Sequence, residues 1–230
     1  MKDNEIEALI KLLETTQDGY TLRRTSFFLM GINPGNPKAI EALIKVLETT
    51  HNDRTLWITA QILGKIGTGN PKAIEALIKV LETTENNSVI KVLETTQYSS
   101  VLWQVAYCLE KIAPGNPKVI EVLIKVLETT QNDDTLCKVA HSLGKIASGN
   151  PKVIEALIKV LETTQNDDTL CQVAQSLEKI APGNPKVIET LIKVLETTQD
   201  DYTRMIALET LEKIGTGNLK AIEALIKARE

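Results

Sequence analysis

The sequence predicts an all-α fold, an α-solenoid in which antiparallel helix pairs stack into a superhelix with a 34-residue period. Three features indicate this fold: an internal repeat, a helical spacing of the apolar residues, and turn residues at the same place in every repeat. The repeat is the most direct, because Gly-Asn-Pro or Gly-Asn-Leu returns every 34 residues, with one interval of 46. These tripeptides begin at Gly35, Gly69, Gly115, Gly149, Gly183 and Gly217.

Two apolar stretches in each repeat have the period of an α-helix. In residues 135–146 the apolar side chains are three or four residues apart, namely Leu136, Val139, Ala140, Leu143 and Ile146. In residues 150–161 the same spacing is seen for Val153, Ile154, Leu157, Ile158 and Leu161. Each pattern gives one broad apolar stripe along a helix, not the alternation of a strand. We name the first kind the A helix of a repeat and the second kind the B helix.

The residues between the helices match the backbone that helix ends require. Gly149 suits the left-handed conformation after a helix C-terminus, Asn150 suits an N-cap, and Pro151 suits the first helical position, where no N–H is needed. The segment Gln-Asn-Asp-Asp-Thr at 165–169 offers capping side chains to the next A helix. Because one helix pair cannot bury its own apolar stripes, it must stack on its neighbours.

We expect a single repeat domain over residues 1–230. A capping helix of the B type at 3–16 is followed by repeats at 20–50, 54–84, 100–130, 134–164, 168–198 and 202–230. The end helices carry charges, Glu5 and Arg229, where inner B helices carry core residues. This is typical of capping units with one face in water, although sequence drift would produce the same pattern.

Residues 85–96 form an insertion that accounts for the longer interval. The sequence Ile-Lys-Val-Leu-Glu-Thr-Thr at 78–84 recurs at 90–96, so the insertion is a partial duplication. It either prolongs the preceding B helix or forms a short separate helix capped by Ser88, and the pair Asn86-Asn87 favours the separate helix. In both cases we expect the superhelix to bend or step near residue 90.

Composition and charge exclude several classes of protein. The chain is 43% hydrophobic and 24% charged, fractions typical of a folded globular protein. Its net charge of −4 provides no strong basic field, so we expect neither nucleic acid nor a membrane as partner. The start lacks the apolar core of a signal peptide, charges interrupt every apolar stretch, and three cysteines are too few for a disulfide framework. These features predict a cytoplasmic protein.

The motif Leu-x-x-[Val/Thr]-Ala-x-x-Leu-x-Lys-Ile, followed by a Gly-containing loop and Ile-x-x-Leu-Ile-x-x-Leu, resembles HEAT repeats. It is most similar to the short HEAT-like repeats named after phycobilisome lyases, and the resemblance covers residues 4–230. Tetratricopeptide repeats share the 34-residue period, but their Trp/Gly/Tyr pattern in the first helix is absent. The resemblance implies B helices that line a concave surface. It also implies either a protein-binding scaffold or a lyase subunit that attaches bilins to phycobiliproteins.

Residues that could carry chemistry are few. The chain has two histidines and no phosphate-binding glycine-rich loop, His-Glu-x-x-His or paired Cys-x-x-Cys spacing. Cys137 and His141 share a helix face, and Cys171 is the equivalent of Cys137 one repeat later, so the three could ligate Zn²⁺ if they converge. Other apolar residues at the repeat position of Cys137 are Trp57, Trp103 and Met205. This variety favours a packing role, and we expect no metal, no cofactor and no catalytic residue.

Two surfaces are candidates for binding a protein or peptide. The B helices repeat a mixed-charge stripe that is either a groove for an extended partner or a solvated face; its first copy is Lys38, Glu41, Lys45 and Glu48. The A helices differ from one another on the face opposite the core, and aromatic and arginine residues gather there in the N-terminal half. Because such residues anchor many interfaces, the candidate binding residues are Tyr20, Arg24, Phe27, Ile58, Trp103 and Tyr107. Alternatively, Phe27 and Phe28 pack beneath the N-terminal helix.

The sequence therefore predicts a non-catalytic scaffold or adaptor of the HEAT-repeat type. A bilin lyase-like subunit acting on phycobiliproteins is the alternative. A designed, consensus-like repeat is a third interpretation, suggested by the near-identical B helices, but the irregular insertion and the scattered cysteines argue against it. The sequence leaves the partner and the oligomeric state open.

Overall fold

The computed structural model describes residues 3–16, 18–32, 35–50, 52–86 and 96–228. Within these ranges the chain consists of α-helices joined by short turns, and no strand occurs there. The helices divide into two compact units, residues 1–122 and 123–230, and the division falls inside the helix Pro117–Thr129. We describe the units separately.

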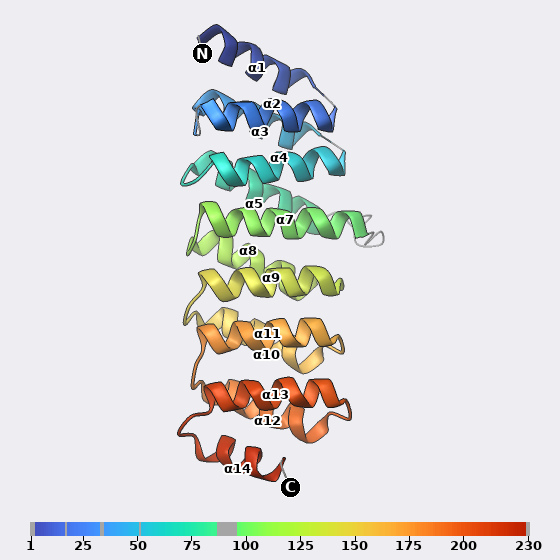
Figure 1. The fold of residues 1–230 in the computed structure, drawn as a ribbon, viewed down its shortest axis with the longest axis vertical. Helices are drawn as coiled ribbons and strands as arrows, with labels where there is room; N and C mark the ends of the chain where they lie inside the picture. Colours follow the sequence, from blue (N-terminus) through green and yellow to red (C-terminus); the bar gives the residue numbers. More distant parts are fainter. Residues whose placement is uncertain (1–2, 17, 33–34, 51, 87–95, 229–230) are drawn as a thin grey trace. The chain divides into compact units, whose positions relative to one another are not determined.

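Unit 1 contains two layers of helices. The A helices are α2 (Gly19–Ile32), α4 (Asp53–Ile66) and α7 (Thr96–Ile112), and the B helices are α1 (Asp3–Thr15), α3 (Pro37–Thr49), α5 (Pro71–Asn86) and the first part of α8 (Pro117–Thr129). Within the A layer α2 contacts α4 and α4 contacts α7, while within the B layer α1 contacts α3 and α3 contacts α5. Figure 1 shows α2, α4 and α7 side by side, in front of α3 and α5.

Unit 2 repeats this arrangement. Its A helices are α9 (Asp133–Ile146), α11 (Asp167–Ile180) and α13 (Asp201–Ile214), and its complete B helices are α10 (Pro151–Thr163), α12 (Pro185–Thr197) and α14 (Leu219–Lys227). Each A helix contacts the next A helix, each B helix contacts the next B helix, and α10 and α12 also contact the A helix that follows them in the chain. The predicted all-α solenoid, built from antiparallel helix pairs, is confirmed.

The core lies between the two layers and consists of the predicted apolar stripes. Val139, Ala140, Leu143 and Leu157 are fully buried. Leu136, Ile146 and Ile154, at the edges of the same stripes, are only half-buried. Since complete burial of one large aliphatic side chain contributes about 1.5–3 kcal/mol, the central positions of each stripe supply most of the stacking free energy.

The helix ends are also as predicted. Asn150 accepts hydrogen bonds at its side chain from the backbone N–H groups of Lys152 and Val153, and Pro151 is the first residue of α10. Gly149 has a φ of 68°, the left-handed conformation that glycine adopts without strain. Its N–H donates to the carbonyl oxygen of Ile180 at 3.0 Å, so the turn also satisfies a terminal carbonyl of the next A helix. In unit 1, Gly69 does the same for Ile112.

The insertion is only partly described. Helix α5 continues to Asn86 and α7 begins at Thr96, whereas residues 87–95, with the predicted cap Ser88, lie outside the described residues. The side chain of Glu5 and the whole of Arg229, the predicted charges of the end helices, lie outside them too. A separate helix in the insertion, a bend near residue 90 and one single domain therefore stay predictions. None of the described helices is both long and apolar enough to cross a membrane.

Candidate functional site

Three aromatic side chains and two arginines on α2 surround a surface pocket of about 320 Å³. Its described lining residues are Tyr20, Arg23, Arg24, Phe27 and Phe28, and we call them the α2 aromatic surface. Tyr20 and Phe27 are each 70% exposed, and Phe28 is 51% exposed. The guanidinium carbon of Arg24 lies 5.9 Å from the centre of the Phe28 ring, within the range of a cation–π contact.

The α2 aromatic surface agrees in part with the residues predicted from the sequence. Tyr20, Arg24 and Phe27 were predicted, and the structure brings them together around one pocket. The alternative in which Phe27 and Phe28 pack beneath the N-terminal helix is wrong, because both rings are largely exposed. Sequence reasoning missed Arg23 and Phe28 as members of the surface. A comparison of repeats could have found Phe28, since the equivalent residues are smaller: Ile62, Cys108, Ser142, Ser176 and Thr210.

The other predicted binding residues lie elsewhere. Tyr107 on α7 is 43% exposed, with the Lys111 ammonium 5.2 Å from its ring centre, and Trp103 on the same helix is half-buried. The placement of Ile58 on the outer face is wrong, because this residue is 3% exposed. Its Cδ1 atom lies 3.2 Å from the place that a Cβ on Gly19 would take, so Ile58 packs against α2. The flank of an A helix that contacts the neighbouring A helix is thus buried, although it lies away from the B layer.

The charged stripe of the B helices forms cross-links between successive helices. Glu41 of α3 binds Lys72 of α5 at 2.7 Å, and Glu48 binds Lys79 at 3.4 Å. The hydrogen bond from Lys72 holds the pKa of Glu41 below its usual value. Further pairs with the same arrangement are Glu7–Lys38, Glu75–Lys118, Glu155–Lys186, Glu162–Lys193 and Glu189–Lys220. All of these pairs are exposed to solvent, where ion pairs contribute little to stability.

A pocket of about 830 Å³ lies over α3 and α5, on the charged stripe of unit 1. Its walls contain both cross-linked pairs, Glu41–Lys72 and Glu48–Lys79. An extended partner in this groove would have to compete with ion pairs that are already formed, and acidic and basic groups alternate along it. The charged stripe is thus a solvated, cross-linked face and a weaker binding candidate than the α2 aromatic surface.

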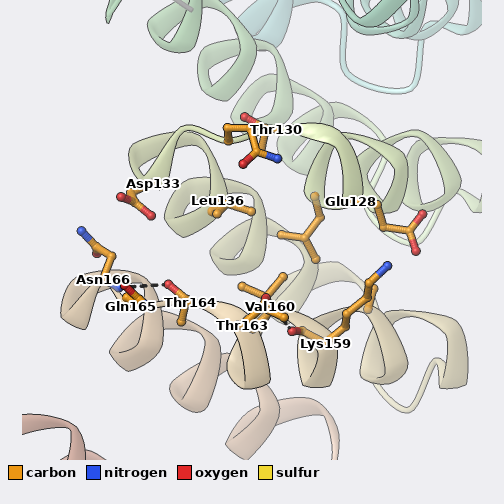
Figure 2. A pocket seen from close by; sticks show the side chains of 13 residues that line it. Glu128, Thr130, Asp133, Leu136, Lys159, Val160, Thr163, Thr164, Gln165 and Asn166 are labelled. Atoms are coloured by element: carbon orange, nitrogen blue, oxygen red, sulfur yellow. Dashed lines mark hydrogen bonds between the residues drawn. The ribbon is translucent and has the colours of Figure 1, made fainter. Parts of the chain in front are cut away.

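A second polar pocket, of about 630 Å³, lies in unit 2 between the turn before α9 and the turn before α11 (Figure 2). Several of its polar atoms serve the helix ends. Asn166 accepts at its side chain from the Thr169 N–H at 2.9 Å, and the Thr164 hydroxyl oxygen accepts from the Asn166 N–H at 3.2 Å. The hydroxyl of Thr163 donates to the Lys159 carbonyl oxygen at 2.9 Å. These interactions assign the side chains of Asn166, Thr164 and Thr163 to the helix ends.

The thiols and His141 do not form a metal site in the described part of the chain, where no three His, Cys, Asp or Glu side chains gather to hold an ion. Cys137 and Cys171 are half-buried, and this burial raises both thiol pKa values. The Gln175 side-chain amide donates to the sulfur of Cys171 at 3.3 Å. Burial raises the pKa of the third thiol, Cys108, to about 11. None of the three cysteines is thereby activated as a thiolate nucleophile.

Comparisons with known proteins agree with the observed repeats. A family model described as HEAT repeats matches residues 6–92, 86–178 and 154–230, which together cover almost the whole chain. No curated protein matches the sequence. A solved structure titled "Computational Design of Self-Assembling Cyclic Protein Homooligomers" is similar at 16% identity over 98% of this chain and 71% of that chain. Its TM-score is only 0.18, so the likeness carries no argument.

Proposed function

The chain belongs to the HEAT-repeat family, and we propose that it is a non-catalytic scaffold that binds a protein partner on the A helices of unit 1. The observation that carries this proposal is the α2 aromatic surface, where three largely exposed rings lie beside two arginines in one pocket. Aromatic and arginine residues dominate the binding free energy of many protein interfaces.

The exposed rings represent a free energy that a partner could recover. Phe27 is 70% exposed and Phe28 51% exposed, and a partner that covers one such ring gains up to about 1.5–3 kcal/mol from the hydrophobic effect. The rings lie together on one helix and not singly, which distinguishes them from the scattered apolar residues on every protein surface. Tyr107 on α7 extends the same outer face, since it is the equivalent of Phe27 two repeats later.

The other surfaces support this choice. The charged stripe of the B helices is cross-linked by its own ion pairs, and the pocket shown in Figure 2 is lined in part by the helix-capping side chains of Thr164 and Asn166. The raised pKa values of Cys137 and Cys171 disfavour thiolate chemistry near neutral pH. A binding role for the aromatic residues therefore fits the described surface better than a catalytic role for the thiols.

The experiment is a comparison of affinity captures from a lysate of the source cells. We expect the wild-type chain to retain a protein that the double variant Phe27→Ser/Tyr107→Ser loses. The matched control is Tyr202→Ser, which removes an aromatic residue of equal 43% exposure to Tyr107, but on α13. Circular dichroism must show the same helicity for all three chains. If the double variant and the wild type capture the same proteins in equal amounts, the proposal is wrong.

A lyase role has its own assay. The chain is incubated with a free bilin and an apo-phycobiliprotein, and the covalently attached bilin is measured by its visible absorbance after denaturation. We expect the same attachment with and without the chain. Faster attachment in its presence would overturn the non-catalytic assignment.

A further inference from the structure

We propose that the α2 aromatic surface binds an acidic amphipathic α-helix of a partner protein, packed on α2 as each A helix of this chain packs on the next. The inference rests on the proposed function and specifies the kind of partner. It follows from three observations: which flank of an A helix its neighbour covers, the exposure of that flank on α2, and the charge of α2.

The close contacts between A helices show which residues face the preceding helix. A Cβ built on Gly64 of α4 would lie 2.7 Å from the Cβ of Cys108 on α7. In unit 2, a Cβ built on Gly144 of α9 would lie 2.8 Å from the Cβ of Ser176 on α11. Cys108 and Ser176 are equivalent residues, so this position of an A helix lies against the A helix before it. The equivalent residue on α2 is Phe28.

At the position of Phe28 this flank is buried on inner A helices, and on α2 it is exposed. The residues equivalent to Phe28 are buried to a few per cent exposure: Ile62, Cys108, Ser176 and Thr210. Of the residues equivalent to Arg24, Ile58, Gln104 and Ile206 are buried, whereas Gln172 is half-buried and Lys138 is exposed. Phe28 itself is 51% exposed and Arg24 is also exposed. The α2 aromatic surface therefore coincides with a flank that the fold elsewhere covers with a parallel helix.

The charge of α2 indicates an acidic partner. Its sequence GYTLRRTSFFLMGI contains two arginines and no acidic residue, a charge of +2 in a chain whose net charge is −4. Several inner A helices that cover the next A helix have acidic residues in their own first turn, for example Asp133 and Asp134 of α9. These first turns lie beside the start of the covered helix, since Asp167 of α11 accepts a hydrogen bond from the Thr203 hydroxyl of α13 at 3.3 Å. The residue of α2 equivalent to Thr203 is Thr21, whose N–H donates to the Asp18 carboxylate at 2.7 Å. In the sequence, Tyr20 directly precedes Thr21 and Arg24 follows it by three residues.

The size of Phe28 sets a second requirement. Its ring is much larger than the side chains of Cys108 and Ser176, and those two already lie opposite glycines. Glycine or another small residue opposite Phe28 therefore gives the ring the most room, eleven residues after the first acidic residue of the covering helix, as Asp133 precedes Gly144. In unit 2, Glu178 of α11 occupies this place opposite the smaller residue Thr210. In a second copy of this chain stacked through α13, the residue at that place is Glu212, whose carboxylate would be placed against the Phe28 ring. The geometry thus favours another protein over a second copy.

The probe is a fluorescent peptide with the sequence of residues 133–146. A hydrocarbon staple replaces Lys138 and Ser142, because an isolated helix of this length is marginal in water. With Lys145→Gln the peptide has two acidic residues and no lysine. Binding to the full-length chain is followed by fluorescence anisotropy. We expect saturable binding that weakens at least tenfold for the chain variants Phe28→Ser and Arg24→Glu and weakens with added salt. The control Tyr202→Ser should bind as the wild type does.

Changes in the peptide test the two requirements separately. Replacing both aspartates by asparagine should weaken binding by removing the charge, and Gly144→Leu should weaken it by blocking the approach to Phe28. The proposal fails if the peptide does not saturate the chain, or if Phe28→Ser binds as tightly as the wild type. It also fails if sedimentation of the chain alone shows self-association that Phe28→Ser abolishes, because the occupant is then a second copy.

The outcomes separate this inference from the proposed function. If the peptide does not bind but capture of a partner still depends on Phe27 and Tyr107, the scaffold function stands and the helical partner is wrong. If the peptide binds at Phe28 but the capture experiment finds no dependent partner, the helix-binding flank stands and the scaffold function is wrong.

Discussion

Gly64 on α4 provides a direct test of how closely the A helices approach each other. A Cβ at this position would lie 2.5 Å from the sulfur, 2.7 Å from the Cβ and 3.2 Å from the Cα of Cys108 on α7. A change of rotamer can move the sulfur but not the Cβ or the Cα. The variant Gly64→Ala therefore has to push α4 and α7 apart.

The expected magnitude follows from two opposing effects. Replacing glycine by alanine inside a helix stabilises it by about 1 kcal/mol. Overpacking of a tight contact costs about 1–3 kcal/mol. We expect Gly64→Ala to lower the free energy of unfolding by about 1 kcal/mol. The matched control is Gly31→Ala near the end of α2, where no atom of the described residues lies within 4 Å of the new Cβ. This control should be neutral or should stabilise the chain by up to about 1 kcal/mol.

Urea denaturation of both variants measures the difference, and hydrogen exchange locates it. We expect the urea midpoints of the two variants to move in opposite directions. At the least, the free energies of unfolding of the two variants should differ by about 1–3 kcal/mol. Exchange should become faster in α4 and α7 of Gly64→Ala, because stability in a repeat array depends on each interface between neighbours. If both variants stabilise the chain equally, α4 and α7 are not in close contact and the reasoning is refuted.

Of four further predictions, one concerns a helix end, two concern a buried thiol and one concerns the candidate surface. Asn150→Ala should cost about 1 kcal/mol of stability in urea denaturation, because its side chain caps the first turn of α10, and an unchanged midpoint would contradict this. Burial raises the pKa of Cys108 to about 11, so this thiol should resist iodoacetamide at pH 8 while Cys171 reacts. Mass spectrometry measures the labelling, and equal labelling of the two thiols would contradict this prediction. Because the unfolded Cys108 thiol ionises first, near pH 9, its contribution should also lower stability as pH rises from about 9 to 11. Phe27→Ser, at a 70% exposed site, should change stability by less than about 1 kcal/mol, and a larger loss would show that the ring is structural.

Helix ends could be predicted from the sequence because they depend on adjacent residues alone. The left-handed Gly149, the N-cap Asn150 and the first-turn Pro151 each satisfy a local requirement of the backbone, and each lies where it was predicted. The apolar stripe of α9 was predictable for a similar reason, since residues three and four apart lie on one face of any helix. Only the degree of burial at the stripe edges, as at Leu136, differs from the expectation.

The candidate site was predicted less well, because lateral contacts have no local signal. The helical period shows that Tyr20 and Ile58 both lie away from the B layer, but it does not show where the neighbouring A helix touches. In the structure Tyr20 is 70% exposed, whereas Ile58 is 3% exposed and faces α2. The same lateral contact explains why Phe28 was missed. Within each unit, the residues equivalent to Phe28 on the later A helices are buried against the preceding A helix, so the position looks like a core position.

The sequence by itself determined the repeat, the capping residues in the turns between its helices, the face of each helix that enters the core and the excess positive charge of α2. The tertiary structure decided which residues of different repeats meet: Glu41 with Lys72, Gly64 with Cys108, and Ile58 with α2. Such partners are 31 or more residues apart, and their meeting depends on how one helix pair slides and rotates against the next. That offset arises from side-chain packing along the whole interface, which no single repeat encodes.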